Sequence, residues 1–304
     1  MYARLTNTRA GAFMESMKIS VLMEDYCPKG GFRGEHGLSL FVETGSATIL
    51  LDTGQGDSFL HNARAMGIDL SRVDAVVLSH AHYDHGGGLE ALYAAFLAAG
   101  VPTLPPLYAG AGYRRRKYSR TGPVVKDIGV PPGALPGPAN TGVPAAVEVD
   151  SAYELASGVW LLAMAPVTDG TVPDGRFRLS GGTAGEATGG VPELVDTFDD
   201  EVSLVIDGPD GLVVVTGCAH RGIVNIVADA LRRFPGCSLA AVAGGFHLSD
   251  APDSAIDRIA DAIDSFAPAR MLPCHCTGPR AFAALYGRHP DRVTWLSCCS
   301  TVEL

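Results

Sequence analysis

The stretch SHAHYDHGGG, residues 79–88, places three histidines and one aspartate within six consecutive positions. Their pattern is H-x-H-x-D-H, formed by His80, His82, Asp84 and His85. The run DAVVLS before it predicts a strand, and the helical pattern LEALYAAFLAAG follows the glycines. In extended chain His80 and His82 point the same way and can bind one metal ion, whereas a turn at Tyr83 directs Asp84 and His85 toward a neighbouring position. Chance histidines on a surface or in a core are the alternative, but the aspartate and the glycine run favour a metal site.

Three further histidines stand at the ends of predicted strands. LVVVTGCAH ends at His220, LAAVAGGFH ends at His247, and ARMLPCH ends at His275. In α/β proteins, binding sites form outside the carboxyl ends of the strands. A buried histidine with satisfied hydrogen bonds is the usual interpretation of any one of them. Three at equivalent strand ends favour a shared site instead.

Composition narrows the class of protein. The chain has 304 residues, of which 47% are hydrophobic and 18% charged, as in a compact globular protein. A net charge of −10 disfavours binding to a nucleic-acid polymer, which requires basic surface. We find no apolar run long enough for a membrane span and no signal peptide. Seven cysteines without a disulfide-like spacing favour a reduced, cytoplasmic location.

The periodicity of the chain predicts an α/β fold. Apolar runs typical of strands are KISVLM, LSLFVE, ATILLD, DAVVLS, VWLLAMA, EVSLVID, LVVVTG, LAAVAGG, ARMLPC and RVTWLS. Helical patterns are SFLHNARAMG, LEALYAAFLAAG, IVNIVADALRRF, SAIDRIADAIDSF and PRAFAALYGRH. The first half is rich in hairpins and the second half alternates strands with helices. Mixed sheets with helices on their outer faces fit this order.

Three segments are left without a regular element. Residues 1–16 are expected to form a loose tail, ahead of one domain at 17–304. Residues 118–146 and 166–198 are expected to be loop insertions, because long loops in compact domains usually serve function. The cluster RRRK at 114–117 is interpreted as a solvated helix face, with an anion-binding patch as the alternative.

Several motifs together resemble the metallo-β-lactamase superfamily. They are EHGLSLFVE (35–43), DTGQGD (52–57), SHAHYDHGGGL (79–89), FDDEVSLVI (198–206), VVVTGCAHRGIVNIV (213–227), GGFHL (244–248) and PCHCTG (273–278). The combination is similar to the branch of 7,8-dihydropterin-6-methyl-4-(β-D-ribofuranosyl)aminobenzene-5′-phosphate synthase-like hydrolases. The resemblance covers most of the chain. It implies an αββα sandwich of two mixed β-sheets with helices outside.

The resemblance also implies a set of site residues. One metal would be held by His80, His82 and His220, and a second by Asp84, His85 and His275. His247 would contact substrate and donate a proton, or act as an accessory ligand. Asp52 would orient a ligand histidine; a turn aspartate is the alternative interpretation.

The chain departs from the superfamily pattern in two places. The region MAPVTDG, residues 164–170, lacks the histidine that many members carry there, and Cys218 stands where many have a bridging aspartate. Cys218 could be a ligand, a redox-sensitive neighbour or a packed small residue, the last being the commonest role of a buried cysteine. Cys274 and Cys276 flank His275, and strand alternation would turn both away from the site.

These residues predict a metal-dependent hydrolase with two divalent ions, zinc first and manganese or iron as alternatives. A water activated by the two ions would attack a small phosphate-, ester- or lactone-containing substrate, which the family name suggests is pterin-related. Asp84 would orient or deprotonate the water, and His247 would protonate the leaving group. The alternatives are a small-nucleotide phosphodiesterase and a non-catalytic metal-bound ligand or redox sensor. A small-molecule substrate is expected, with neither a nucleic-acid polymer nor a membrane as partner.

Overall fold

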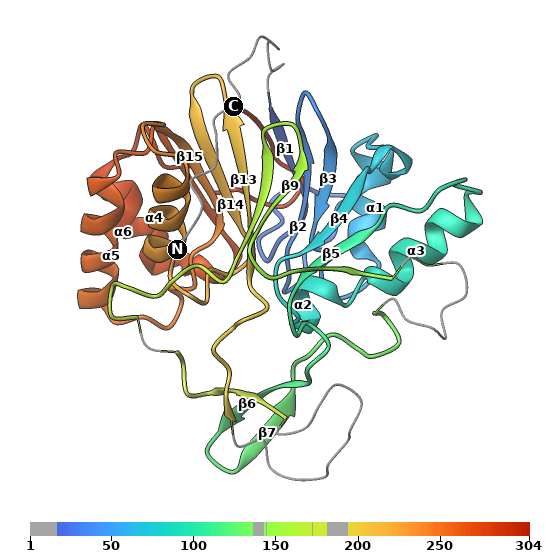
Figure 1. The fold of residues 1–304 in the computed structure, drawn as a ribbon, viewed down its shortest axis with the longest axis horizontal. Helices are drawn as coiled ribbons and strands as arrows, with labels where there is room; N and C mark the ends of the chain where they lie inside the picture. The colour runs from blue at the N-terminus through green and yellow to red at the C-terminus, as the bar shows by residue number, and fades with distance from the viewer. Residues whose placement is uncertain (1–16, 136–142, 144, 172, 181–193) are drawn as a thin grey trace.

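The fold is seen in a computed structural model that describes residues 17–135, 143, 145–171, 173–180 and 194–304. The predicted tail, residues 1–16, lies outside this part. The described chain forms two large mixed sheets and one small sheet (Figure 1). The first large sheet has the strand order β17-β1-β2-β3-β4-β5-β8. Its strands are β1 (Lys18–Met23), β2 (Ser39–Glu43), β3 (Thr48–Leu51), β4 (Ala75–Leu78), β5 (Leu107–Gly110), β8 (Val147–Val149) and β17 (Thr301–Glu303).

The second large sheet has the order β16-β15-β14-β13-β10-β9. Its strands are β9 (Ala152–Ala156), β10 (Val159–Ala163), β13 (Val202–Gly208), β14 (Gly211–Thr216), β15 (Leu239–Gly245) and β16 (Arg270–Cys274). The turn GPDG, residues 208–211, joins β13 and β14 as an antiparallel hairpin, because glycine, proline and aspartate favour tight turns. Strands β14, β15 and β16 are parallel, so their carboxyl ends lie at one edge.

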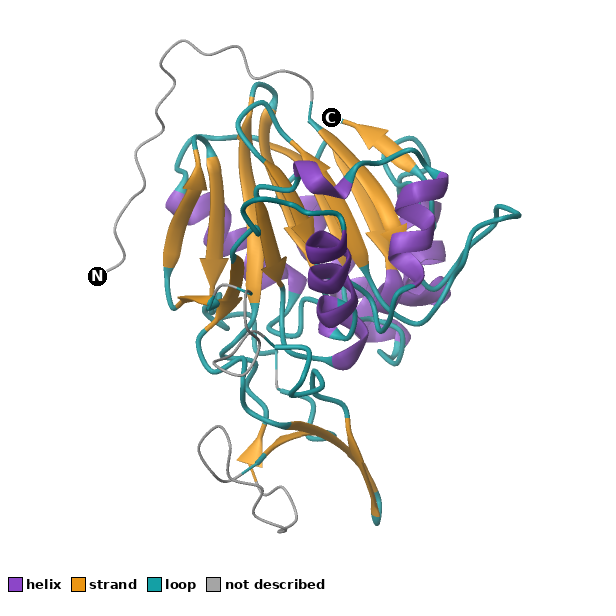
Figure 2. Ribbon diagram, turned by 90° about the vertical axis from the view of Figure 1, so that its right-hand side faces the viewer, coloured by secondary structure: helices purple, strands orange, loops and turns teal. Residues whose placement is uncertain are grey.

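Helices cover the outer faces of both sheets (Figure 2). Helices α1 (Ser58–Ala65) and α3 (Leu89–Ala98) pack on the first sheet, and α4 (Ile223–Arg233), α5 (Asp253–Ser265) and α6 (Gly278–Arg288) on the second. Between the sheets lies an apolar layer whose side chains, such as Ile19, Val77, Leu204 and Val215, are fully buried. The predicted strands that lie in the two large sheets are therefore covered on both faces. This explains why their apolar residues run continuously and do not alternate with polar ones. The predicted αββα architecture is confirmed. In the described residues, no helix is long and apolar enough to cross a membrane.

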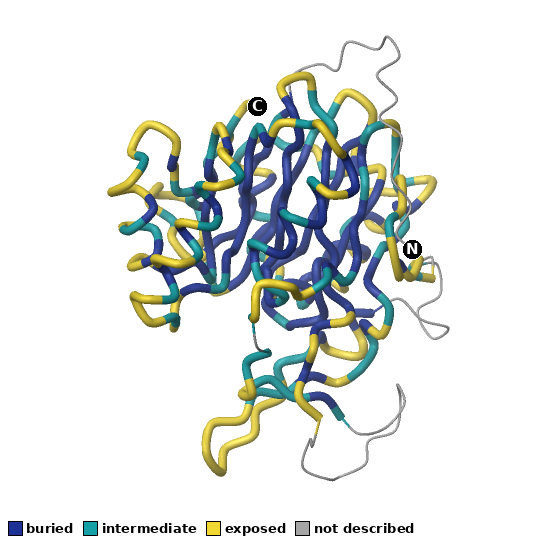
Figure 3. Tube along the Cα trace, turned by 60° about the vertical axis from the view of Figure 1, so that its left-hand side comes forward, coloured by how far each residue is buried: buried dark blue, intermediate teal, exposed yellow. Residues whose placement is uncertain are grey.

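A small sheet occupies the segments for which the sequence predicted only loops. Strands β6 (Lys117–Thr121), β7 (Val124–Asp127), β11 (Phe177–Leu179) and β12 (Leu194–Val195) pair in the order β12-β11-β6-β7. The β6–β7 hairpin projects from the body, and its tip is exposed (Figure 3). We call this unit the small sheet. Its strands escape prediction because β7 is exposed at every position and so lacks alternation.

Two further predictions are corrected by the structure. RVTWLS, residues 292–297, is not a strand: it makes a single bridge, from Val293 to Met271, and otherwise runs as loop. The cluster RRRK is not a helix face either. It leads into β6, where Arg116 pairs with Asp127 and Lys117 is buried. Its last two cations, Arg116 and Lys117, already have carboxylate partners.

Lys117 ties the small sheet to the body of the protein. Its ammonium group lies 2.6 Å from an Asp196 carboxylate oxygen and 2.8 Å from one of Asp200. Asp200 also accepts the backbone N–H of Ala81, which lies between His80 and His82, at 2.8 Å. Burial opposes the charge on Lys117, but Asp200 and Asp196 outweigh it and raise its pKa above the ordinary value. Lys117 therefore remains a cation between two buried carboxylates.

Replacing Lys117 with Met should lower the free energy of unfolding by about 3–5 kcal/mol, because it leaves two buried carboxylates without their cation. Lys18→Met is the matched control: Lys18 pairs with Glu43 at 2.6 Å on the surface and should cost about 0–1 kcal/mol. Denaturant titration measures both. A loss below about 1 kcal/mol for Lys117→Met would show that the buried contacts do not stabilise the fold.

Candidate metal centre

The opening motif lies where β4 ends at Leu78, at the edge shared with the other strand ends. Short helix α2 (Tyr83–Gly86) supplies the turn that the motif predicts and carries Asp84 and His85. His80 Nε2 lies 3.0 Å from His82 Nδ1, and one ring nitrogen of each lies within 4.8 Å of one on His220. The structure thus brings together the three residues that were predicted to hold one ion.

The residues predicted to hold a second ion also meet. His85 Nε2 lies 3.2 Å from His275 Nε2. An Asp84 carboxylate oxygen lies 3.7 Å from the first of these nitrogens and 3.5 Å from the second. His36, which the sequence analysis did not single out, reaches the same oxygen with Nε2 at 3.3 Å. One carboxylate therefore faces three imidazoles.

Asp52 lies behind His85, as the resemblance implies. Its carboxylate accepts from His85 Nδ1 at 2.7 Å, and also from the backbone N–H of Ser79 at 2.7 Å and the Ser79 hydroxyl at 2.6 Å. These bonds fix the His85 ring so that Nε2 points toward His275 and Cys218. This geometry is consistent with Asp52 positioning His85. Asp52 also occupies a turn, because its φ of 61° is in the left-handed region.

Three carboxylates behind other histidines escaped sequence analysis. Asp25 accepts from His275 Nδ1 at 2.6 Å, and Glu24 accepts from the His275 backbone N–H at 2.6 Å. Glu201 accepts from the backbone N–H of His220 at 2.6 Å. Burial raises the pKa of Glu201 to about 7. The sequence did show an acidic pair after β1 and the motif FDDE, but neither pattern indicates which histidine the carboxylates contact.

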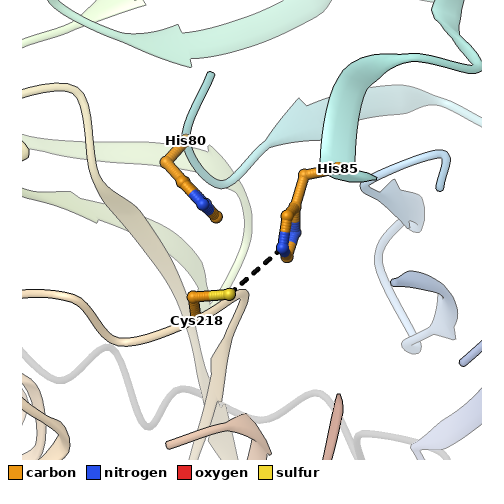
Figure 4. Close-up of side chains that lie close together, drawn as sticks. All are labelled: His80, His85 and Cys218. Carbon is orange, nitrogen blue, oxygen red and sulfur yellow. Dashed lines mark hydrogen bonds between the residues drawn. The ribbon is translucent and has the colours of Figure 1, made fainter. Parts of the chain in front are cut away.

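Cys218 points into the centre of the cluster. Figure 4 shows its sulfur beside His80 and His85, and the Sγ atom lies 3.1 Å from His85 Nε2. Its sulfur is also within 4.8 Å of a ring nitrogen of His220 and of His247. Of the three interpretations left open by the sequence, the packed small residue fits least, because its neighbours here are polar.

His247 lies beside the first histidine group. Its ring centroid is 4.1 Å from that of His220, and its buried Nδ1 has no hydrogen-bond partner among the residues that the structure describes. On the far side, His220 stacks on Phe198 with centroids 3.7 Å apart, and the Lys117 ammonium lies 4.8 Å from the Phe198 ring centre. The buried Lys117 contacts thus also fix the aromatic ring on which His220 rests.

The prediction for Cys276 is wrong in its orientation. Strand β16 ends at Cys274, and His275 starts a short 3₁₀ turn (His275–Thr277) with a φ of 49°. Alternation therefore ends one residue before Cys276, whose sulfur lines the pocket with His275. Cys274 does behave as predicted, because it is buried in the apolar layer between the sheets.

Strained backbone recurs at the strand ends that form the site. Asp52, Ala219, His247 and His275 all have left-handed backbone, with φ values of 61°, 56°, 52° and 49°. Each such non-glycine residue costs on the order of 1–3 kcal/mol and persists only where its surroundings enforce it. The strain turns the chain sharply after β3, β14, β15 and β16, and it directs side chains toward one pocket.

Electrostatics favour ligand chemistry. Burial, and then the neighbouring imidazoles, hold the pKa values of His80 and His220 well below the ordinary range, so their nitrogens keep free lone pairs. Burial alone would raise the pKa of Asp84. The charge of His85 and the hydrogen bond from His275 outweigh it and lower that pKa below its usual value. A neutral imidazole, as at His80 and His220, and an ionised carboxylate, as at Asp84, are the protonation states in which these side chains bind a cation.

A pocket of about 680 Å³ opens onto these groups, a size suited to a small molecule. Its floor is the histidine cluster, and its outer wall includes Ser119, Lys126 and Ile128 of the small sheet and the loop after β7. Phe177, at the start of β11, lies with its ring centroid 5.2–5.8 Å from those of His82, His220 and His247. The small sheet therefore covers the histidines.

The donor set fits a divalent transition metal. Nε2 of His82 and of His220 are buried with no hydrogen-bond partner in the described structure, and they belong to one cluster of nitrogens. A buried nitrogen lone pair without a donor carries a desolvation cost that a metal ion would remove. His80, His82 and His220 would hold one ion; Asp84, His85 and His275 would hold another.

Comparisons with known proteins agree with this geometry. The family model for the metallo-beta-lactamase superfamily matches residues 33–236. The chain is 27% identical over 293 residues to a Methanocaldococcus jannaschii protein, 7,8-dihydropterin-6-methyl-4-(beta-D-ribofuranosyl)-aminobenzene-5'-phosphate synthase, covering 88% of this chain and 90% of that one. Among solved structures, Tm1679, a metal-dependent hydrolase of the beta-lactamase superfamily, matches with a TM-score of 0.77 and 32% identity over 95% of this chain and 99% of that one. A diphosphatase of the PhnP family matches in fold, with a TM-score of 0.52 and 13% identity over 95% of this chain and 98% of that one.

The family match covers more than half of the chain, and the likeness to Tm1679 extends over nearly all of it. The resemblance drawn from the motifs is confirmed. The protein is therefore an enzyme of the metallo-beta-lactamase superfamily, with the fold of its metal-dependent hydrolases.

Proposed function

We propose that this enzyme hydrolyses a small phosphate-, ester- or lactone-containing substrate with a water activated at a two-ion centre. The observation that carries the proposal is the meeting of two groups of side chains, His80, His82 and His220 and Asp84, His85 and His275, beside one pocket that His82, Asp84, His220 and His275 line. The M. jannaschii relative is named for a pterin-related phosphate compound, which makes a pterin-like phosphate a substrate to test first. Zinc is the first choice of ion, and the location is proposed to be cytoplasmic.

Divalent ions, when bound there, supply Lewis acidity and lower the pKa of nearby water. The chain contributes the remaining steps. Asp84 lines the pocket and its pKa is held below the usual value, so its carboxylate can orient a water molecule by accepting a hydrogen bond from it. His247 lines the same pocket with Nδ1 unpaired, so a protonated ring can donate a proton to the leaving group. Phe177 covers the histidines and excludes bulk water from them.

The ligand assignment is tested by metal content. The protein purified without added metal should carry close to two equivalents of ion, and His82→Ala and His220→Ala should lower that content to the same extent. His61→Ala is the control, because the half-buried His61 lies outside the histidine cluster and contacts the Gly31 carbonyl at 2.9 Å. Unchanged content in His220→Ala would remove His220 from the ligand set.

Asp52→Asn should weaken metal binding by about 10–100-fold, because the amide replaces one accepting oxygen with an NH2 donor and cannot accept all three bonds from His85 Nδ1, the Ser79 N–H and the Ser79 hydroxyl. Competition against a chelator measures the affinity. Asp69→Asn serves as the control, since Asp69 only caps the short turn Leu70–Arg72. An affinity equal to that of the wild type would leave Asp52 with its turn function alone.

Catalysis is tested on a panel of phosphodiester, phosphomonoester, lactone and thioester substrates. His247→Gln should retain its metal and lose about 10²–10⁴-fold in kcat, as expected when a general acid is removed. Loss of metal from this variant would make His247 an accessory ligand instead. Turnover of short nucleotides alone would favour the phosphodiesterase reading, and absence of any turnover by metal-loaded protein would favour a sensor.

A further inference from the structure

One face of the small sheet places a row of three side chains along the pocket wall. Ser119 on β6 lies opposite Phe177 on β11 and opposite Lys126 on β7. Side chains of directly paired residues project from the same face of a sheet. All three residues line the pocket, and Figure 1 shows β6 and β7 below the large sheets, on the side where α2 lies. The row therefore leads outward from the histidines, which Phe177 covers, to Lys126.

Lys126 differs from the other charged groups in the lining of this pocket. Each carboxylate in the lining contacts a histidine or an arginine. These carboxylates belong to Asp25, Asp84, Asp174 and Asp250. Arg176, the other basic side chain besides the histidines, pairs with two of them. Among the residues that the structure describes, Lys126 forms no ion pair, so its ammonium group faces the pocket without a counter-ion.

The carboxylate next to Lys126 in the chain does not supply a counter-ion. Asp127 follows Lys126, but strand alternation places it on the opposite face, where it pairs with Arg116. Arg120, next to Ser119 on β6, also alternates to that opposite face and lies outside the pocket lining. The face toward the pocket therefore carries a hydroxyl and an ammonium group side by side, without a carboxylate from the same hairpin.

From this arrangement we propose that Lys126 and Ser119 bind an anionic group of the substrate, a phosphate or a carboxylate, at the outer wall of the pocket. This inference rests on the proposed function, because it concerns the substrate of the same pocket. The ammonium group neutralises the anion, and the Ser119 hydroxyl donates a hydrogen bond to one of its oxygens. The anionic group serves recognition, whereas the bond that breaks lies at the histidine cluster.

The strand spacing separates the anionic group from the histidines. Neighbouring strands lie about 4.8 Å apart, so the Cα atoms of Phe177 and Lys126, two strands apart, are separated by about 10 Å. The Phe177 ring lies beside the rings of His82 and His220 and so marks the inner end of the row. A substrate that spans the pocket therefore carries its negative charge roughly 10 Å from the bond that is broken.

The exposure of Lys126 sets the expected size of the effect. Water and salt weaken the attraction between an exposed ammonium group and an anion. Such an ion pair contributes up to about fivefold in affinity, and the hydrogen bond from Ser119 contributes about two- to fivefold. The contribution of Lys126 should decrease as the ionic strength rises.

Three aryl esters with a common scissile bond test the proposal. Their far ends, about 10 Å from that bond, carry a phosphate, a carboxylate or a neutral amide group, and three aryl phosphodiesters carry the same ends. With the metal-loaded protein, the charged ends should lower KM about fivefold relative to the amide, and Lys126→Met should remove that difference. Lys126→Arg should retain it, because the charge is kept. A lower KM for the phosphate end than for the carboxylate end would identify the group as a phosphate.

Arg120→Met is the matched control, because Arg120 belongs to the same hairpin but lies outside the pocket lining. This variant should keep the preference for charged ends. The loss in Lys126→Met should appear in KM rather than in kcat, because the anionic group is bound equally in the ground state and the transition state. Equal KM values for the three ends in the wild-type protein would overturn the proposal. An equal rise in KM for the amide and the charged probes in Lys126→Met would overturn it too, because that result indicates a structural effect.

The two proposals fail separately. If the metal-loaded protein hydrolyses none of these probes, calorimetry on the same protein gives their dissociation constants. A preference of about fivefold for the charged ends, lost in Lys126→Met, would then reject the hydrolase and support this inference. Turnover without any preference for charge would reject this inference alone.

Discussion

Buried carboxylates behind the histidines are the constraint on which the rest of the site depends. Imidazole nitrogens lie as close as 3.0 Å to one another in this pocket, and several face inward with no protein donor. Such rings hold fixed positions only when their outer atoms are anchored. Asp52 anchors His85, Asp25 anchors His275, and Glu201 holds the backbone of His220. Each carboxylate lies on a different strand end or loop, so the two sheets must pack correctly before the cluster exists.

Lys117 connects the small sheet to this anchored cluster in a similar way, through buried charges. Asp200 connects Lys117 of β6 with the backbone N–H of Ala81, between His80 and His82. The Lys117 ammonium also lies against the Phe198 ring on which His220 stacks. The small sheet is therefore attached to the histidine cluster through buried charge and aromatic stacking. The energetic cost of burying three charged groups is offset by the hydrogen bonds among them and to the backbone.

Much of the fold could be predicted because apolar periodicity reports burial directly. β14 is buried at every position, β1 and β2 are buried at all but one end position, and α4 has a clear apolar face, so residue type alone identified them. The predictions failed where the pattern of apolar residues does not match burial or secondary structure. β7 is exposed at all four positions, and RVTWLS combines an apolar pattern with loop geometry.

The site, like the fold, could be predicted only in part. Histidines at strand ends could be read from the sequence, because strand ends of parallel sheets meet at one edge. Asp25 and His36 could not, since their partners lie as many as 250 residues away along the chain. Cys276 was misplaced because alternation was extended past Cys274, whereas a left-handed residue had already ended the strand. Backbone strain of this kind has no residue-type signature outside glycine and asparagine.

The hairpin of β6 and β7 has a bearing on how this enzyme could diversify. Its root is fastened by Lys117, but Val124–Asp127 are exposed, and the turn before them contains Gly122 in left-handed backbone with open space around it. Ser119 and Lys126 nevertheless contribute to the pocket wall. Substitution or lengthening of this hairpin would therefore remodel the outer half of the pocket and leave the histidines undisturbed. The histidine cluster, which tolerates little change, is thus separate from the part of the pocket wall where substitutions can alter substrate preference.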